Sequence, residues 1–199
     1  MDALVTITAE RGLDQVSLRE VARAAGVSVA TVQYYCRSKD EMLRMAFEFV
    51  TSRITERATS IEKAGTVAAA LRQGLLEFLP LDVERSLEAR VYLAFAARAA
   101  VSADLARVLH AHLSEMRTLC AQAYRQARSR DETAADLDPE QAAAATAALV
   151  DGLLLHLLTD PAGLSADAAV AVLDQHLRGY LDVGARPRAS TWMRDSCLS

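Results

Sequence analysis

LREVARAAGVSVATVQYYCR, residues 18–37, is the stretch that decides the fold of this chain. It reads as two short helices joined by a tight turn, which is the arrangement of a helix-turn-helix. Gly26 suits the turn because glycine adopts a positive φ without a steric penalty from Cβ. Ala22 is small enough to let the two helices approach closely. Their apolar contacts are predicted to come from Val21, Ala25, Val27 and Val32.

Capping residues stand at the predicted helix starts around this stretch. Ser17 begins a capping box before the first helix, and Ser28 is placed to cap the second. A further capping box begins at Ser38 and opens a third amphipathic stretch. Another short helical stretch, residues 3–11, precedes the segment. An ordinary helical hairpin needs none of these flanks, so they favour a DNA-binding domain.

Residues 3–50 resemble the DNA-binding domain of the tetracycline-repressor (TetR) family of bacterial regulators. The matching motifs occur in order: AERG at 9–12, VSLREVA at 16–22, AGVS at 25–28, Tyr35, and SKDEML at 38–43. The rest of the chain resembles the ligand-binding half of the choline-responsive BetI-type repressors. That resemblance rests on LPLD at 79–82, EARVYLAF at 88–95, LDPE at 137–140 and LVDGL at 149–153.

The resemblance implies which residues meet DNA, because the second helix of such a motif enters the major groove. Base contacts are implied for Ser28, Val29, Ala30 and Tyr34, and contacts to the phosphate backbone for Ser17, Arg19, Thr31, Gln33 and Lys39. Lys39 adds its charge to the free N–H groups at a helix start, which also suit a phosphate.

The chain departs from the family pattern at three places. Gln33 stands where the family usually has tyrosine, and glutamine can donate to a phosphate or read adenine. Cys36 stands where an aromatic residue is usual, and we expect it to fill the small core of the head. Tyr35 is expected mainly to pack in that core, whereas Tyr34 faces DNA. Family members also have several more residues before the first helix. Either the start of this sequence is misassigned or truncated, or the head is less stable and binds DNA more weakly.

Composition favours a helical protein with a sizeable core. The chain has 199 residues, of which 52% are hydrophobic and only 5% aromatic. A formal net charge of −4 argues against a protein that coats nucleic acid nonspecifically. It does not exclude a specific DNA reader, whose basic groups need line only one face. Residues 21–39 contain no acid, which marks them as the DNA-facing stretch.

The cysteines and the lack of a visible signal peptide favour a reducing, cytoplasmic setting. Cys36, Cys120 and Cys197 are widely separated and show no metal-ligand spacing, so neither a metal site nor a cofactor is expected. The apolar segment 142–158 approaches the length of a membrane span, but Asp151 and His156 interrupt it. We therefore expect a buried helix there and no membrane partner.

The pattern predicts an all-α fold of about nine helices without strands. Residues 1–45 are expected to form the DNA-binding head, residues 46–183 a ligand-binding and dimerisation body, and residues 184–199 a disordered tail. The expected helices are about 3–11, 18–25, 28–36, 39–61, 67–78, 83–99, 102–130, 139–159 and 165–183.

The sixth, seventh and eighth predicted helices are expected to hold a small organic molecule. The candidate ligand-binding residues are Tyr92, Phe95, Arg98, His112, Met116, Cys120, Tyr124, Asp151 and Leu155. Ordinary core packing is the alternative for each of them. A buried Asp151 would need a partner, either structural or a cationic ligand. Choline-like ligands favour aromatic cages, and the few aromatic residues here do not support carrying choline specificity over.

Two apolar stripes near the end of the chain predict a dimer interface. They comprise Leu149, Leu153 and Leu157 in the eighth helix, and Val170, Leu173, Leu177 and Tyr180 in the ninth. Two such helices from each subunit can form a four-helix interface about a two-fold axis. A two-fold dimer presents its reading helices symmetrically, so the double-stranded DNA operator should be near-palindromic.

These features predict a ligand-responsive, DNA-binding transcriptional regulator. The favoured form is a homodimeric repressor that a small organic effector releases from its operator, with the fourth helix linking body to head. Three alternatives stay open: an activator, a helical ligand-binding or interaction protein whose head no longer binds DNA, and an enzyme. Nothing in the sequence resembles a nucleophile–base set, a glycine-rich phosphate loop or a paired carboxylate cluster, so the enzyme is disfavoured.

Overall fold

The computed structural model describes residues 1–11, 17–60, 65–133 and 136–181. Within these ranges the chain forms nine α-helices and no β-strand, which confirms the all-α prediction. The helices are α1 Asp2–Arg11, α2 Leu18–Ala25, α3 Val29–Tyr35, α4 Lys39–Thr59, α5 Val67–Leu76, α6 Val83–Ala99, α7 Ala103–Ser129, α8 Pro139–Thr159 and α9 Ala166–Arg178.

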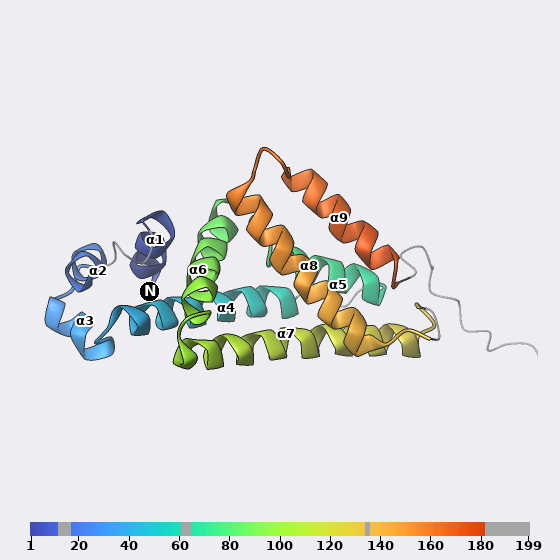
Figure 1. The fold of residues 1–199 in the computed structure, drawn as a ribbon, viewed down its shortest axis with the longest axis horizontal. Helices are drawn as coiled ribbons and strands as arrows, with labels where there is room; N and C mark the ends of the chain where they lie inside the picture. The colour runs from blue at the N-terminus through green and yellow to red at the C-terminus, as the bar shows by residue number, and fades with distance from the viewer. Residues whose placement is uncertain (12–16, 61–64, 134–135, 182–199) are drawn as a thin grey trace, which may run out of the picture.

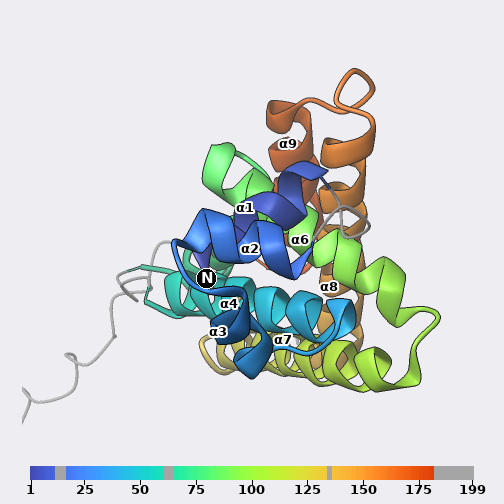
Figure 2. The ribbon, with the colours of Figure 1, turned by 90° about the vertical axis from the view of Figure 1, so that its left-hand side faces the viewer.

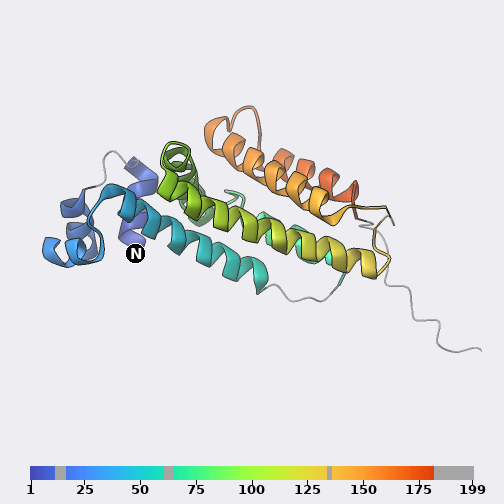
Figure 3. The same cartoon turned by 60° about the horizontal axis from the view of Figure 1, so that its bottom comes forward.

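The molecule is elongated, and the first three helices lie at one end of it (Figure 1). α1, α2 and α3 form this head, and α4 runs from the head into the body. In the body, α7 packs along α8, which in turn packs against α9. Figure 2 views the molecule from the head, with α1, α2 and α3 in front of α4 and α6. Figure 3 shows α4 and α7 running along the length of the molecule.

The helix starts follow the capping residues seen in the sequence. The hydroxyls of Ser17, Ser28 and Ser38 each accept a hydrogen bond from the backbone N–H three residues later, at 3.0–3.2 Å. Such bonds satisfy amides that have no partner inside the helix. Gly26 ends α2 with φ of +67°, as expected for the turn. Ser102 occupies the cap position of α7, but its side chain makes no capping hydrogen bond.

The head has a small apolar core of its own, and two sequence expectations about it are wrong. Val21, Ala22, Val32 and Cys36 are buried there, as predicted. Ala25 and Val27 are exposed, Val27 with 43% of its surface accessible. Both lie at or beyond the end of α2, where the chain turns outward, so they cannot reach the contact between the helices.

α4 and α6 take part in both the head core and the body core. From α4, Met42, Ala46 and Val50 pack into the head, whereas Leu43 and Phe47 pack into the body. α6 contributes Val91 to the head core, and its other buried apolar residues, Ala89, Tyr92, Phe95 and Ala99, belong to the body core. Since i and i+4 positions share one helix face, two adjacent apolar stripes on one helix can serve two cores. Head and body are therefore joined by two helices, where the sequence suggested one.

Several helix ends differ from the sequence expectation by a few residues. α4 ends at Thr59, α5 at Leu76 and α9 at Arg178, each earlier than predicted. The tail expected at 184–199 and Gly12 lie outside the described residues. Among the described helices, α8 alone is long and apolar enough to cross a membrane. Its buried side chains pack on α7 and α9, as in the core helix of a folded domain.

Candidate DNA interface and effector cavity

The outer face of α3 and its flanks carries all nine residues implied to meet DNA. Each of them is exposed: Ser17, Arg19, Ser28, Val29, Ala30, Thr31, Gln33, Tyr34 and Lys39. Val32 and Cys36 point the other way, into the head core, and the Cys36 thiol donates to the carbonyl of Val32 at 3.3 Å. Burial raises the pKa of this thiol, so it stays protonated and acts as an apolar core residue.

Tyr34 and Tyr35 lie side by side on this outer face. Their rings meet edge to face, with centroids 5.2 Å apart. Tyr34 is 80% exposed, and Tyr35 is 63% exposed, so the expectation that Tyr35 packs in the core is wrong. The reason is that Cys36, after the last turn of α3, takes the inward position. Tyr35 is therefore a further candidate DNA-binding residue, which the sequence reasoning missed. Its position next to Tyr34 in the sequence was the signal that could have identified it.

Lys39 begins α4, beside the end of α3. Its helix is capped by Ser38, and the Glu41 side chain accepts from the backbone N–H of Arg37 at 2.7 Å. These contacts fix the short connection from α3 to α4. Lys39 is thereby held at a helix N-terminus on the same side of the head as α3, where a DNA phosphate can be bound.

A cavity of about 280 Å³ lies in the body between α4, α5 and α7. Most of its wall is apolar, and Met116 and Cys120 of α7 are the two predicted ligand residues that line it. The remaining lining residues are Thr55, Ala58 and Thr59 of α4, 65–67, Ala70, Leu71, Gly74, Leu75, Phe78, Leu119, Gln122, Ala123, Gln126 and Arg130. The small lining residues, such as Ala58, Ala70 and Gly74, leave this space open between the helices. The sequence alone does not show which helices face one another across it.

The other seven predicted ligand residues lie outside this cavity. Tyr92, Phe95, His112 and Tyr124 pack in the body, and Leu155 is exposed on α8. Arg98 forms a two-pronged ion pair with Asp40 at 2.9 and 3.0 Å, which ties the end of α6 to the start of α4. This contact also holds the pKa of the Asp40 carboxyl below its usual range. Arg98 is thus a contact at the junction between head and body.

An aromatic cluster fills the body next to α4. The rings of Phe47 and Phe95 stack with centroids 3.9 Å apart, and Tyr92 and His112 surround Phe47. His112 Nε2 is buried without a hydrogen-bond partner in the described chain, and burial lowers the pKa of this imidazole. Burial away from water disfavours the charged imidazolium, so His112 is neutral in the folded state.

Asp151 of α8 stands at the edge of this cluster. The Tyr92 hydroxyl donates to its Oδ1 at 3.0 Å, so the partner that a buried Asp151 requires is a tyrosine. Burial raises the pKa of Asp151, an effect that the Tyr92 hydrogen bond and the nearby charge of Arg117 oppose. The carboxylate therefore destabilises the folded state once it is ionised.

Replacing Asp151 by asparagine is expected to stabilise the protein at pH 7. The raised pKa means that the folded state binds the proton more tightly than the unfolded state does. The carboxyl's contribution is thus fully present below the unfolded pKa and is lost as pH rises through the folded pKa. Urea unfolding from pH 4 to pH 7 should show Asp151→Asn gaining on the wild type as pH rises. A difference that stays constant over this range would contradict the assignment.

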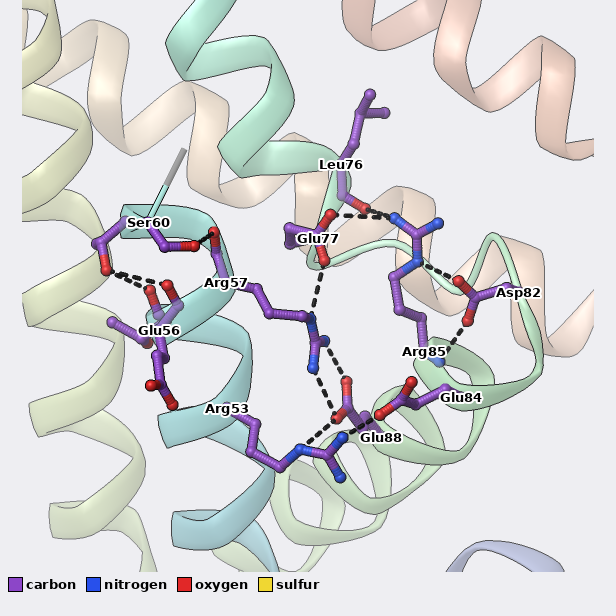
Figure 4. A network of polar contacts seen from close by, with 12 residues as sticks. Arg53, Glu56, Arg57, Ser60, Leu76, Glu77, Asp82, Glu84, Arg85 and Glu88 are labelled. Atoms are coloured by element: carbon purple, nitrogen blue, oxygen red, sulfur yellow. Dashed lines mark hydrogen bonds and ion pairs between the residues drawn. The ribbon is translucent and has the colours of Figure 1, made fainter. Parts of the chain in front are cut away.

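A network of ion pairs joins α4 to α6 and to the end of α5 (Figure 4). Glu88 of α6 is only 2% exposed, and both of its oxygens accept from Arg57 of α4, at 3.1 and 2.5 Å. Arg57 also donates to Glu77 at 2.9 Å, and Arg53 lies between Glu84 and Glu88. A buried carboxylate with two arginines fixes how α4 and α6 lie against each other. The sequence reasoning missed it because the partners are 31 residues apart.

α8 and α9 carry the residues predicted for a dimer interface, and they divide into two groups. Leu153, Leu173 and Leu177 are buried within the protomer, where they pack in the body core and cannot reach a partner. Leu149, Leu157, Val170 and Tyr180 are partly exposed. Outward-facing apolar residues that the prediction omitted are Leu155 and Val172, 42% and 40% exposed. These helices therefore leave apolar surface uncovered, but not at all seven predicted positions.

Two family models match the chain, one over the head and the other over most of the body. Residues 1–46 match the bacterial regulatory proteins of the tetR family, and residues 67–182 match the C-terminal part of BetI-type transcriptional repressors. The second match covers the α5 and α7 walls of the cavity, but not its α4 wall, and it includes α6 to α9. It also includes the buried Glu88 and the half-buried Asp151, so these two carboxylates lie inside the region that resembles these repressors.

Individual proteins agree with the family models. The chain is 30% identical to the HTH-type transcriptional regulator PksA of Bacillus subtilis, covering 88% of this chain and 85% of that one. A transcriptional regulator from Rhodococcus sp. Rha1 superposes with a TM-score of 0.78 at 35% identity, covering 92% and 95%. A regulator from Saccharomonospora viridis, solved with choline, has a TM-score of 0.76 at 21% identity, covering 89% and 91%.

Sequence motifs, the all-helical fold and these matches agree on one assignment. The head matches a DNA-binding domain, and the body matches the regulatory half of BetI-type repressors. The chain belongs to the TetR family of bacterial transcriptional regulators.

Proposed function

We propose that this protein is a cytoplasmic, homodimeric repressor that a small organic effector releases from a near-palindromic operator. The observation that carries the proposal is a continuous connection from an exposed reading face to a body cavity. α3 presents its outer face to solvent, and α4 extends from the head to one wall of the cavity. A molecule bound in the body can therefore act on the position of the head.

DNA binding by this head would combine two kinds of contact. Tyr34 and the small residues at the start of α3 are exposed where base edges would lie. Lys39, Thr31 and Arg19 flank them and would bind phosphates, which position the protein without reading sequence. The two kinds of contact predict different mutant behaviour.

Lys39→Ala is expected to weaken binding to every DNA sequence and to reduce its salt dependence. Removing one phosphate contact lowers the slope of log K against log salt by about 0.9. Fluorescence anisotropy with a selected operator and a scrambled duplex, at several salt concentrations, measures both. Arg107→Ala is the control, since Arg107 is an exposed base on α7 that pairs with Asp104 on the same helix.

Tyr34→Ala should instead reduce the preference of the protein for its operator over the scrambled duplex. A full-length protein without salt-sensitive preference for any selected duplex would overturn the regulator proposal and favour a head that no longer binds DNA. Operator binding that activates transcription from a reporter gene would favour an activator over a repressor.

A dimer through α8 and α9 would set the spacing of the two reading helices. The outer side of α8 has exposed small residues at Ala144 and Ala148, which permit close helix approach, and Leu155 continues this side. α9 adds the exposed Val172. Two helices per subunit can form a four-helix interface about a two-fold axis. The reading helices of such a dimer meet one face of DNA at about 34–36 Å or a multiple of it.

Val172→Glu is expected to shift the protein from dimer to monomer. The substitution places a charge in an apolar interface, and the two-fold axis brings in its copy from the partner. Sedimentation equilibrium at micromolar concentration should give twice the chain mass for the wild type and a lower mass for the variant. Val101→Glu is the matched control, because Val101 is exposed at the turn between α6 and α7. A monomeric wild type would contradict the proposal.

Release from DNA would pass through both helices that connect head and body. α4 lines the cavity with Thr55 and Thr59 and packs Met42 into the head core. α6 is bound to α4 through Glu88 and Arg57 at one end and through Arg98 and Asp40 at the other. A ligand shifts this arrangement only by its difference in affinity for the two states. Typical coupling of about 1–3 kcal/mol corresponds to roughly 5–150-fold weaker operator binding.

A further inference from the structure

The cavity between α4, α5 and α7 has an uneven distribution of polarity. Among the described residues that line it, Arg130 is the one with a charged side chain. Arg130 stands at the C-terminal end of α7 and is exposed to solvent. Gln126 and Gln122 precede it by one and two helical turns on the same face, and both are exposed. The polar groups contributed by α7 thus form a line along one side of the cavity.

These polar groups are not engaged elsewhere in the described chain. The structure gives no hydrogen bond or ion pair to the guanidinium of Arg130, or to the side-chain amides of Gln122 and Gln126, within residues 1–11, 17–60, 65–133 and 136–181. Glu132, a nearby acid, accepts from the backbone N–H of Val67 at 2.8 Å and is not among the lining residues. As far as the described residues go, the donors of Arg130 and the two glutamines are available to bind a ligand.

The buried end of the cavity is apolar and uncharged. Leu75, Met116 and Cys120 are almost fully buried there, and Leu71 and Phe78 complete this apolar wall. Burial raises the pKa of the Cys120 thiol to about 11, so the group is neutral at physiological pH. A volume of about 280 Å³ is close to the lower end of the usual range for ligand pockets, roughly 300–1,000 Å³. The space therefore suits a short apolar chain or a small ring.

The same cavity is poorly suited to a quaternary ammonium. Such a cation is bound by several aromatic rings or by a carboxylate. Phe78 is the only aromatic residue among the described lining residues, and none of those residues is acidic. The rings that could build a cage, Phe47, Phe95 and Tyr92, pack against one another in the separate aromatic cluster. A choline-like effector would thus find neither element here.

We propose that the effector of this protein is an amphipathic organic acid. Its single anionic group binds Arg130 at the cavity mouth with help from Gln126, and its apolar part lies between α5 and α7. The proposal deepens the proposed function, since it names the chemical class that the same cavity takes. A charge-assisted hydrogen bond from a guanidinium is stronger than a neutral one, and it selects against a cation.

Three probes with the same apolar chain test the charge class: decanoate, 1-decanol and decyltrimethylammonium. Calorimetric titration of the full-length protein, below the micelle concentration of each, should give affinities in that order. Arg130→Gln should weaken decanoate about tenfold and leave decanol unchanged. Arg107→Gln, the same change near the other end of α7, should leave all three unchanged. Cys120→Trp should fill the cavity and weaken all three.

The outcomes separate the ligand class from the regulatory role. Tighter binding of decyltrimethylammonium than of decanoate, or a decanoate affinity unaffected by Arg130→Gln, would overturn the acid proposal. Neither result would affect the DNA-binding experiment with Lys39→Ala. Decanoate that binds through Arg130 with equal affinity with and without operator DNA would support the ligand class. By reciprocity of coupling, the same result would overturn the release mechanism.

Discussion

Glu88→Ala is expected to lower the free energy of unfolding by about 3 kcal/mol. Removing one partner of a buried ion pair leaves the other charge without compensation, which costs about 3–5 kcal/mol. Glu88 is nearly inaccessible, but Arg57 is 31% exposed and can partly return to water, which places the effect at the lower end. Urea unfolding at fixed protein concentration, with the midpoint and slope compared, measures the loss.

Glu84→Ala is the matched control for this prediction. Glu84 pairs with Arg53 in the same network but is 59% exposed, so its loss should cost at most about 1 kcal/mol. The double variant Arg57→Met, Glu88→Leu removes both charges and should recover much of the stability. A Glu88→Ala variant as stable as Glu84→Ala would mean that the pair does not hold α4 on α6.

Phe47→Ala is expected to lower the free energy of unfolding by about 3–5 kcal/mol, at least as much as Glu88→Ala does. The ring is 1% exposed, stacks on Phe95 and contacts His112, so its removal leaves a cavity between α4, α6 and α7. The loss combines the transfer free energy of the ring with the dispersion contacts that the cavity forfeits. Thermal and urea unfolding should both show it.

Phe49→Ala provides the comparison within the same helix. Phe49 is only partly buried, and the guanidinium of Arg53 lies 5.7 Å from the centre of its ring. Its loss should cost less, about 1–2 kcal/mol, because part of the ring stays in contact with water after folding. Equal effects of the two substitutions would contradict the assignment of Phe47 to the contact between α4 and α6.

Local sequence signals determined the architecture of this chain. The serines at 17, 28 and 38 and the glycine at 26 act within three or four residues of themselves, so helix starts and the head turn could be predicted. The spaced motifs around them identified the family, and the exposed face of α3 followed from the helix-turn-helix. Helix ends were less certain, since few residues there specify where a helix stops.

Tertiary packing alone decided which side chains meet. Glu88 and Arg57 are 31 residues apart, Arg98 and Asp40 are 58 apart, and Tyr92 and Asp151 are 59 apart. Helical periodicity shows that a residue is buried but not which helix it faces. Leu153, Leu173 and Leu177 therefore looked like interface residues until the fold placed them in the protomer core.

The cavity shows the same division most clearly. Met116 and Cys120 could be suspected from one face of α7, but the opposite wall comes from α4 and α5, which no local pattern connects to them. The sequence by itself determined a TetR-family helical regulator with a defined reading helix. The tertiary structure decided the position of the cavity and placed Arg130 as the one charged side chain among its described lining residues. The physical reason is that helix formation depends on near neighbours, whereas a binding site depends on contacts between distant ones.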